Sequence, residues 1–212
     1  MTSLSGPLRD AAAAALGGQL IVFPTDTVYG IGTRPDDPAA TARVFEAKRR
    51  PRDIELPVLV ATVTAARVLA VFDERAERLA AALWPGPITL VLPRAADASS
   101  WDLGGDATTV GVRVPRHPLA LALLAETGPL AVTSANLSAL PPAETCGELQ
   151  TLFGDAVAVY LCQDGPLDGV ASTVIDLAHG PATIIREGSL PREVLAELLP
   201  EESSLLDSRP SS

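Results

Sequence analysis

Four short groups of polar side chains in this sequence have the types that bind small anions and polar substrates. The first group is Thr25-Asp26-Thr27-Val28-Tyr29, in which two hydroxyls, a carboxylate and a phenol follow the apolar run 19–23. Open α/β sheets bind ligands beyond the carboxyl ends of their strands, so this segment is a candidate binding loop. The alternative is an ordinary polar turn that only redirects the chain.

The second group is a basic stretch over residues 43–52. It contains five cations and one acid, a local charge of +4, namely Arg43, Lys48, Arg49, Arg50 and Arg52 with Glu46. Lys48 is the only lysine, whereas the other 15 cations of the chain are arginines. A compact basic region suits a small polyanion such as ATP, because a local field steers a ligand even to an acidic protein. A solvated helix end, where cations favour the C-terminal dipole, is the alternative.

The third and fourth groups lie at the ends of predicted strands. The segment Thr133-Ser134-Ala135-Asn136-Leu137-Ser138 follows an apolar run with short hydroxyl and amide side chains. Such side chains bind a phosphate or an amino-acid head group, or simply form an Asx or Ser turn. Arg113 in GVRVP and Arg186 in ATIIREG end two further runs. Because arginine forks recognise carboxylates and phosphates, this pair is a candidate anion site.

Alternating helix and strand patterns must position these groups. Capping and breaking residues predict helices at 7–16, 38–48, 118–126, 145–153 and 191–199, and two short ones with N-caps at Thr64 and Asp73. Apolar runs predict strands at 19–23, 56–60, 88–92, 109–114, 130–133, 157–161, 172–176 and 182–186, with PTDTVYGIG as a loop. This order predicts a single α/β domain with a twisted, mixed open sheet flanked by helices. Neither the G-x-G-x-x-G nor the P-loop fingerprint is present.

The composition of the chain argues against several classes of protein. The chain has 212 residues, of which 47% are hydrophobic and 20% charged, and this excludes a disordered chain. A net charge of -10 argues against a nucleic-acid binder, because such affinity rests on neutralising phosphates. No apolar run approaches the roughly 18 residues that a membrane-spanning helix needs. Because the N-terminal residues also lack a signal-peptide pattern, we expect a cytoplasmic protein.

The chain has only two cysteines and two histidines, which argues against a metal site or a catalytic thiol. Cys146 and Cys162 have no metal-type spacing, and we expect both to be reduced packing residues. With only His117 and His179 in the chain, we expect neither a histidine-rich metal site nor a Ser-His-Asp triad.

Taken in order, the motifs LIVFPTDTVYGIG, AKRRP, WPGPITLVL, GVRVPRHP, TSANLS, ASTVID and IIREG resemble the YrdC-like family. The resemblance covers residues 5–190 and implies the YrdC-like fold in a short, single-domain form, followed by a helix at 191–199 and a flexible tail at 200–212. It implies a threonylcarbamoyl-adenylate synthase, which condenses L-threonine, bicarbonate and ATP and releases pyrophosphate. A separate transferase would then carry the threonylcarbamoyl group to tRNA, with weak or no direct tRNA binding by this chain.

The resemblance also implies roles for eight residues. Threonine would be contacted by Thr27, Arg113, Ser134 and Ser172, and ATP by Lys48, Arg50, Asn136 and Arg186. Of these, Lys48 and Arg50 would be catalytic, because they would hold the triphosphate and the carboxylates. Mg²⁺ is expected with ATP, without a protein metal site and without a tightly bound organic cofactor.

The sequence departs from the family pattern at several positions, and other functions stay open. Leu59 stands where the family has a threonine-contacting histidine, Glu55 places an acid near the phosphates, and Ala139 replaces a glycine. A non-catalytic RNA- or nucleotide-binding module is the main alternative. A carbamoyl-transfer domain of the hydrogenase-maturation type is a weaker one, because that class carries cysteine clusters.

Overall fold

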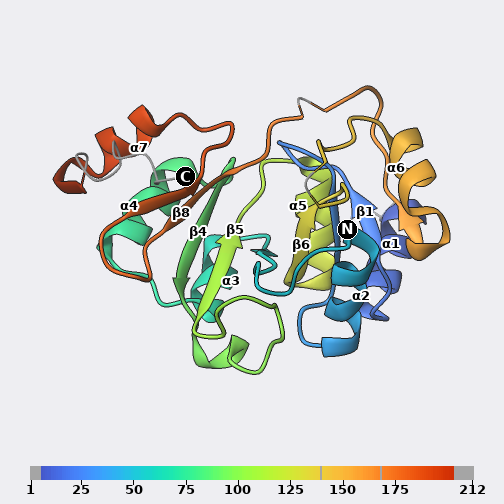
Figure 1. The fold of residues 1–212 in the computed structure, drawn as a ribbon, viewed down its shortest axis with the longest axis horizontal. Helices are drawn as coiled ribbons and strands as arrows, with labels where there is room; N and C mark the ends of the chain where they lie inside the picture. The colour runs from blue at the N-terminus through green and yellow to red at the C-terminus, as the bar shows by residue number, and fades with distance from the viewer. Residues whose placement is uncertain (1–5, 139, 168, 203–212) are drawn as a thin grey trace.

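Short apolar runs form a mixed sheet in the computed structural model, which describes residues 6–138, 140–167 and 169–202 (Figure 1). The strands are β1 (Ile21–Phe23), β2 (Gly30–Thr33), β3 (Val58–Leu59), β4 (Ile88–Pro93), β5 (Thr109–Arg113), β6 (Leu130–Ser134), β7 (Val159–Tyr160), β8 (Thr173–Asp176) and β9 (Thr183–Arg186). Their order is β7-β1-β2-β6-β3-β5-β4-β8-β9. The pairs β1–β7, β3–β5 and β4–β8 are parallel and the other pairs antiparallel, so the predicted mixed open sheet is confirmed.

Several helices begin after a residue whose side chain caps the first turn. They are α1 (Gly6–Leu16), α2 (Pro38–Lys48), α3 (Val63–Leu69), α4 (Glu74–Leu83), α5 (Pro118–Thr127), α6 (Cys146–Phe153) and α7 (Arg192–Leu198), with short 3-10 turns η1 (Ala96–Ala98), η2 (Gly154–Ala156) and η3 (Pro200–Glu202). Asp37 and Asp73 accept hydrogen bonds from the first turns of α2 and α4, as predicted. The predicted cap at Thr64 is wrong, because Thr62 accepts from the Ala65 N–H and begins α3 two residues earlier.

Successive side chains of a strand point to opposite faces of the sheet, so the core has two layers, one on each face. On one face α1 and α5 pack at the β1 end of the sheet, where Leu8 and Leu123 belong to the same apolar cluster as Phe23 and Val132. The opposite face carries the larger cluster, in which α2, α3 and α4 contribute side chains beside β4 and β5. Figure 1 shows α1, α5 and α6 at one end of the molecule and α4, α7 and β8 at the other. The first face therefore stays uncovered by helices along β5, β4 and β8.

Strand β2 corrects the prediction of a loop over this segment. Glycine weakens a strand, so GIGT did not indicate one. In the structure Gly30–Thr33 pairs with both β1 and β6. A Cβ atom at Gly32 would lie 2.5 Å from the Ala131 carbonyl oxygen, so the close approach of the two backbones requires glycine there.

A disulfide joins Cys146 to Cys162, so the prediction of two reduced packing residues is wrong. Cys146 begins α6 and Cys162 follows β7, and the chain between them reverses so that their Cα atoms lie 5.7 Å apart. Cys162 is exposed rather than packed. The two cysteines are 16 residues apart in sequence. That spacing alone does not reveal that the chain returns and brings them together.

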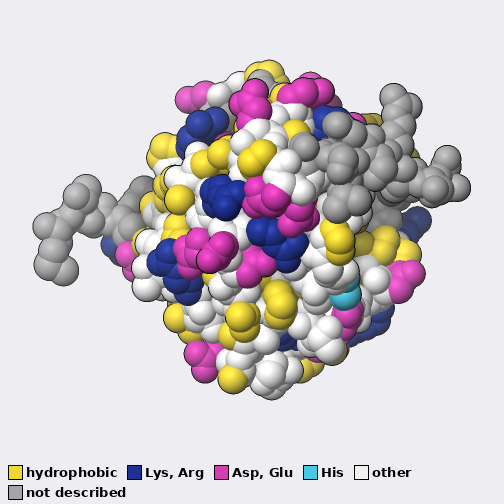
Figure 2. All heavy atoms as spheres, turned by 90° about the vertical axis from the view of Figure 1, so that its left-hand side faces the viewer, with side chains coloured by type: hydrophobic (Ala, Val, Ile, Leu, Met, Phe, Trp, Pro, Cys, Tyr) yellow, Lys and Arg dark blue, Asp and Glu magenta, His cyan; other side chains and the backbone are white. Residues whose placement is uncertain are grey.

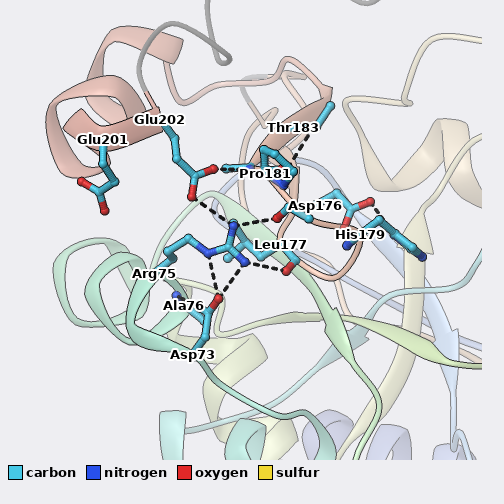
Figure 3. A network of polar contacts seen from close by, with 12 residues as sticks. Asp73, Arg75, Ala76, Asp176, Leu177, His179, Pro181, Thr183, Glu201 and Glu202 are labelled. Atoms are coloured by element: carbon cyan, nitrogen blue, oxygen red, sulfur yellow. Dashed lines mark hydrogen bonds and ion pairs between the residues drawn. The ribbon is translucent and has the colours of Figure 1, made fainter.

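Arginines of α4 anchor the C-terminal turn. Arg75 donates to the carbonyls of Gly180 and Leu177 and forms an ion pair with Glu202 at 3.0 Å (Figure 3). Arg78 pairs with Glu201 at 2.8 Å. Figure 2, which views this end, shows basic and acidic side chains interspersed over the surface. Residues 200–202 of the predicted tail are thus held by ion pairs, whereas 203–212 lie outside the described residues.

In the described part of the chain, no helix combines the length and apolar character that crossing a membrane requires.

Candidate active site

A cavity of about 420 Å³ lies on the uncovered face of the sheet. Alternation along the strands explains its lining, because neighbouring side chains point to opposite faces. In β5, Val110 and Val112 enter the core, whereas Thr109, Gly111 and Arg113 line the cavity. The same alternation places Thr89 and Val91 of β4, Leu59 of β3, and Val132 and Ser134 of β6 in its wall. Sheet register therefore brings hydroxyls, an arginine and apolar side chains to one surface.

The segment between β1 and β2 holds the hydroxyl of Thr27 in a chain of hydrogen bonds. Thr25 Oγ1 donates to the Val28 carbonyl at 2.6 Å and accepts from the backbone N–H groups of Thr27 and Val28, at 3.2 and 3.3 Å. Thr27 Oγ1 contacts Thr25 Oγ1 at 3.0 Å and accepts from Arg113 at 3.0 Å. A hydroxyl has one donor and two acceptor sites, so one site of Thr27 is left for a ligand.

Arg113 is fixed by three elements at the end of β5. Its Nε donates to the Gly86 carbonyl at 3.0 Å, its Nη1 to Thr27, and its Nη2 to Asp26 at 2.6 Å. Burial lowers the pKa of Arg113, the Asp26 carboxylate opposes that shift, and the charge of Arg186 adds to it. The side chain is thus an oriented cation inside the cavity.

Arg50 and Arg186 supply two further cations whose hydrogen bonds go to neutral oxygens. Arg50 donates to the carbonyls of Ile54 and Glu55, at 3.2 and 2.9 Å. Arg186 donates to the Ser172 carbonyl at 2.9 Å and to its hydroxyl at 3.1 Å, and Ser172 contacts Thr89 at 3.0 Å. Burial lowers the pKa of both arginines, and the charge of Arg186 lowers that of Arg50 further. An anion bound between them would relieve this repulsion.

Lys48 takes a different position from the three arginines. Its side chain is only 1% exposed, and its Nζ donates to the carbonyls of Ser134 and Asn136, the latter at 2.6 Å, and to Asn136 Oδ1 at 3.4 Å. Burial, together with the nearby charge of Arg50, lowers the pKa of Lys48 to about 7. The Asn136 amide donates to the carbonyls of Leu137 and Leu140. Lys48 and Asn136 therefore brace the backbone that carries Ser134 and are not part of the cavity wall.

Acidic groups also line the cavity. Glu55 accepts from Arg94 at 3.2 Å, and burial raises the pKa of its carboxyl to about 7 against the effect of Arg94. At the rim, His179 contacts Asp176 at 2.8 Å and Asp106 at 3.2 Å. The hydrogen bond to Asp176 raises the pKa of His179 most, and the one to Asp106 adds to the shift. The cavity wall thus combines arginines with acidic side chains.

Comparison with known proteins identifies the family of this chain. Residues 13–188 match the model of the Sua5/YciO/YrdC family, which carries the description "Telomere recombination". The chain belongs to the Sua5/YciO/YrdC family.

Named members of the Sua5/YciO/YrdC family are similar over most of the chain. A Mycobacterium tuberculosis (strain ATCC 25618 / H37Rv) protein named "Putative threonylcarbamoyl-AMP synthase" is 41% identical over 198 residues, covering 92% of this chain and 90% of that protein. Threonylcarbamoyl-AMP synthase of Pyrococcus abyssi (strain GE5 / Orsay) is 39% identical over 196 residues, covering 92% of this chain and 57% of that protein. The crystal structure of P. abyssi Sua5 complexed with L-threonine superposes with a TM-score of 0.83 at 37% identity, covering 92% of this chain and 58% of that chain.

Six of the eight predicted site residues of this family member line one cavity. They are Thr27, Arg50, Arg113, Ser134, Ser172 and Arg186. Lys48 and Asn136 lie behind Ser134 instead. Of the departures from the family pattern, Leu59 and Glu55 line the cavity, and Ala139 lies outside the described residues.

Sequence reasoning did not single out Thr89, Asp176 or His179 as site residues. Thr89 is a hydroxyl in the otherwise apolar run ITLVL, and strand alternation alone marks it as facing away from the core. Asp176 and His179 follow a strand, but their convergence with Asp106 depends on a loop contact 73 residues away in sequence.

Proposed function

We propose that this chain is a threonylcarbamoyl-AMP synthase, which converts L-threonine, bicarbonate and ATP into threonylcarbamoyl-AMP, pyrophosphate and water. The observation that carries the proposal is the pairing of Arg113 with Thr27 in the same cavity as Arg50 and Arg186. That arrangement combines a site for an amino-acid carboxylate and hydroxyl with a site for a polyanion. The names of the relatives support it.

The reaction requires three anions to be held together. Threonine carries a carboxylate, bicarbonate a single charge and ATP a triphosphate, so converging cations and hydroxyls must offset their repulsion. In our assignment Thr27, Arg113, Ser134 and Ser172 bind threonine, whereas Arg50 and Arg186 bind the phosphates. Lys48 and Asn136 support the site through the backbone that carries Ser134.

Once the substrates are held in position, the reaction proceeds in two steps. The threonine amine and bicarbonate form a carbamate with loss of water, and a carbamate oxygen attacks the α-phosphorus. The bond from that phosphorus to the bridging oxygen breaks, and pyrophosphate leaves with its electron pair. Guanidinium groups at the leaving phosphates stabilise the charge that develops there, so no covalent protein nucleophile is needed.

Mg²⁺ is expected to arrive with ATP and to offset phosphate charge. Within the described residues, no group of three or more His, Cys, Asp or Glu side chains could hold a metal ion. An ion that arrives with ATP takes most of its ligands from phosphates and water.

The product would pass to a separate transferase that modifies tRNA beside the anticodon. We expect weak or no direct tRNA binding, because the chain has a net charge of -10. A cytoplasmic location suits these substrates.

Omission of single substrates tests the proposal. Purified protein should release pyrophosphate from ATP only when threonine and bicarbonate are both present. Pyrophosphate release that does not depend on threonine would overturn the assignment. Salt-sensitive RNA binding without turnover would favour the non-catalytic alternative.

A further inference from the structure

Asp26 is a buried carboxylate beside the cavity that was not among the eight predicted site residues. Its Oδ1 accepts from Arg113 Nη2 at 2.6 Å and from the Arg116 backbone N–H at 2.9 Å. The two side chains are 7% and 6% exposed, so water screens their ion pair little. They lie 87 residues apart in sequence, and the pair connects the β1–β2 segment to the end of β5.

The contacts of Arg113 leave a defined part of its guanidinium for a ligand. A guanidinium has five N–H donors. Among the described residues, Gly86, Thr27 and Asp26 accept one each from Nε, Nη1 and Nη2. One N–H remains on each terminal nitrogen for the oxygens of a ligand carboxylate.

Asp26 also makes Arg113 electrostatically different from the other two arginines. It forms a buried ion pair with Arg113, whereas the hydrogen bonds of Arg50 and Arg186 go to neutral oxygens and the carboxylate of Asp53 acts on Arg50 without an ion pair. A triphosphate is attracted most strongly to the cations that have no ion-paired carboxylate. A singly charged carboxylate competes better at a cation whose charge is already partly offset.

We propose that Asp26 is the positioning residue of the threonine site, which holds Arg113 against Thr27 and reserves it for the substrate carboxylate rather than for phosphate. The inference rests on the proposed function and adds how one cavity separates a carboxylate from a polyphosphate. Without Asp26 the cavity would present three arginines of similar charge, and a polyphosphate would occupy the position of threonine.

The test compares wild type with Asp26→Asn in product formation from labelled threonine. Threonine is varied at saturating ATP, and ATP is then varied at saturating threonine. We expect the KM for threonine to rise roughly 10²-fold, as for a misplaced binding group, and the KM for ATP to change by less than about 3-fold. Inorganic triphosphate should become a competitive inhibitor against threonine in the variant, whereas in wild type it should compete with ATP. If Asp26 had only a structural role, triphosphate would compete with ATP in the variant as it does in wild type.

Glu202→Gln is the matched control, because it weakens the ion pair to Arg75 at the far end of the molecule (Figure 3). Both KM values of that variant should stay within about 2-fold of wild type. Arg113→Met and the double variant Asp26→Asn/Arg113→Met address folding, since the double variant leaves no unpaired buried charge. If Asp26 acts through Arg113, these two variants have the same KM for threonine.

Equal changes in both KM values, or an additive effect of Asp26→Asn in the Arg113→Met background, would overturn the inference. Failure of the proposed function is a different result, because the wild-type protein itself would then form no threonine-dependent product.

Discussion

The ammonium of Lys48 donates to the backbone carbonyl of Asn136 over 2.6 Å and links the end of α2 to the segment that carries Ser134. A second carbonyl, of Ser134, and the Asn136 side chain complete its surroundings. The only lysine of the chain thus occupies a small, buried, oxygen-lined position. A compact ammonium fits there, whereas a planar guanidinium needs more room.

Replacement of Lys48 should therefore damage turnover. We expect Lys48→Met to lower kcat on the order of 10²-fold, because the segment that carries Ser134 would lose its support and a small misplacement of a binding group costs that much. Lys48→Arg should recover only part of that loss. Arg49→Ala and Arg52→Ala are controls and should change kcat only a few-fold, because both side chains are exposed. Steady-state pyrophosphate release, with folding checked by circular dichroism, measures all four variants, and a fully active Lys48→Arg would refute the special role of lysine.

Substrate choice should follow from the hydroxyl of Thr27, which lies in the cavity wall. Thr27 Oγ1 accepts from Arg113 and contacts Thr25, and its one remaining hydrogen-bonding site matches the threonine hydroxyl. Valine would leave that site of a buried hydroxyl without a partner, at a cost of about 1–3 kcal/mol, or roughly 10- to 100-fold in kcat/KM. Serine keeps the hydroxyl but loses methyl contacts with the apolar wall, so we expect it to lie between the two. Competition between the three amino acids at fixed ATP measures the order, and equal kcat/KM for valine and threonine would contradict it.

The stability of the protein should depend on pH through Glu55. Its carboxyl has a pKa of about 7 in the folded protein and an ordinary value of 4.5 in the unfolded chain. Between these values the unfolded chain loses a proton that the folded protein retains, so the free energy of unfolding falls as pH rises. The loss contributed by Glu55 is complete above about pH 7 and amounts to about 3 kcal/mol.

Glu55→Gln should remove that contribution in urea unfolding measured across this pH range. Glu77→Gln, which changes an exposed partner of Arg67, is the control and should keep the wild-type decline. If Glu55→Gln shows the same decline as wild type, the folded protein does not hold a protonated carboxyl at this position.

Much of the fold could be predicted from local signals, and the exceptions have physical causes. The caps at Asp37 and Asp73 and the apolar strands depend on residues that are close together in the sequence, so local patterns predict them. Strand β2 was missed because Gly30 and Gly32 serve a close backbone approach to β6, which depends on a distant strand. The same holds for Lys48, because the backbone carbonyls that surround its ammonium have no signature in the sequence.

The disulfide between Cys146 and Cys162 gives a prediction about stability rather than catalysis. A cross-link across a loop of this length stabilises by about 3 kcal/mol. The double Cys146→Ala/Cys162→Ala variant should lose about that much in free energy of unfolding and keep turnover within a few-fold, because neither residue lines the cavity. Reductant should reproduce the loss in wild type and have no effect on the variant. A hundredfold fall in turnover without unfolding would instead reveal a role for a thiol.

The identity of the nucleotide product decides whether the protein is a threonylcarbamoyl-AMP synthase. The protein is incubated with ATP, threonine and isotopically labelled bicarbonate, and the product is resolved by mass spectrometry. We expect a nucleotide that contains AMP, threonine and one labelled carbon, formed in equal amount to pyrophosphate. An adenylate of threonine without the labelled carbon, or AMP alone, would contradict it.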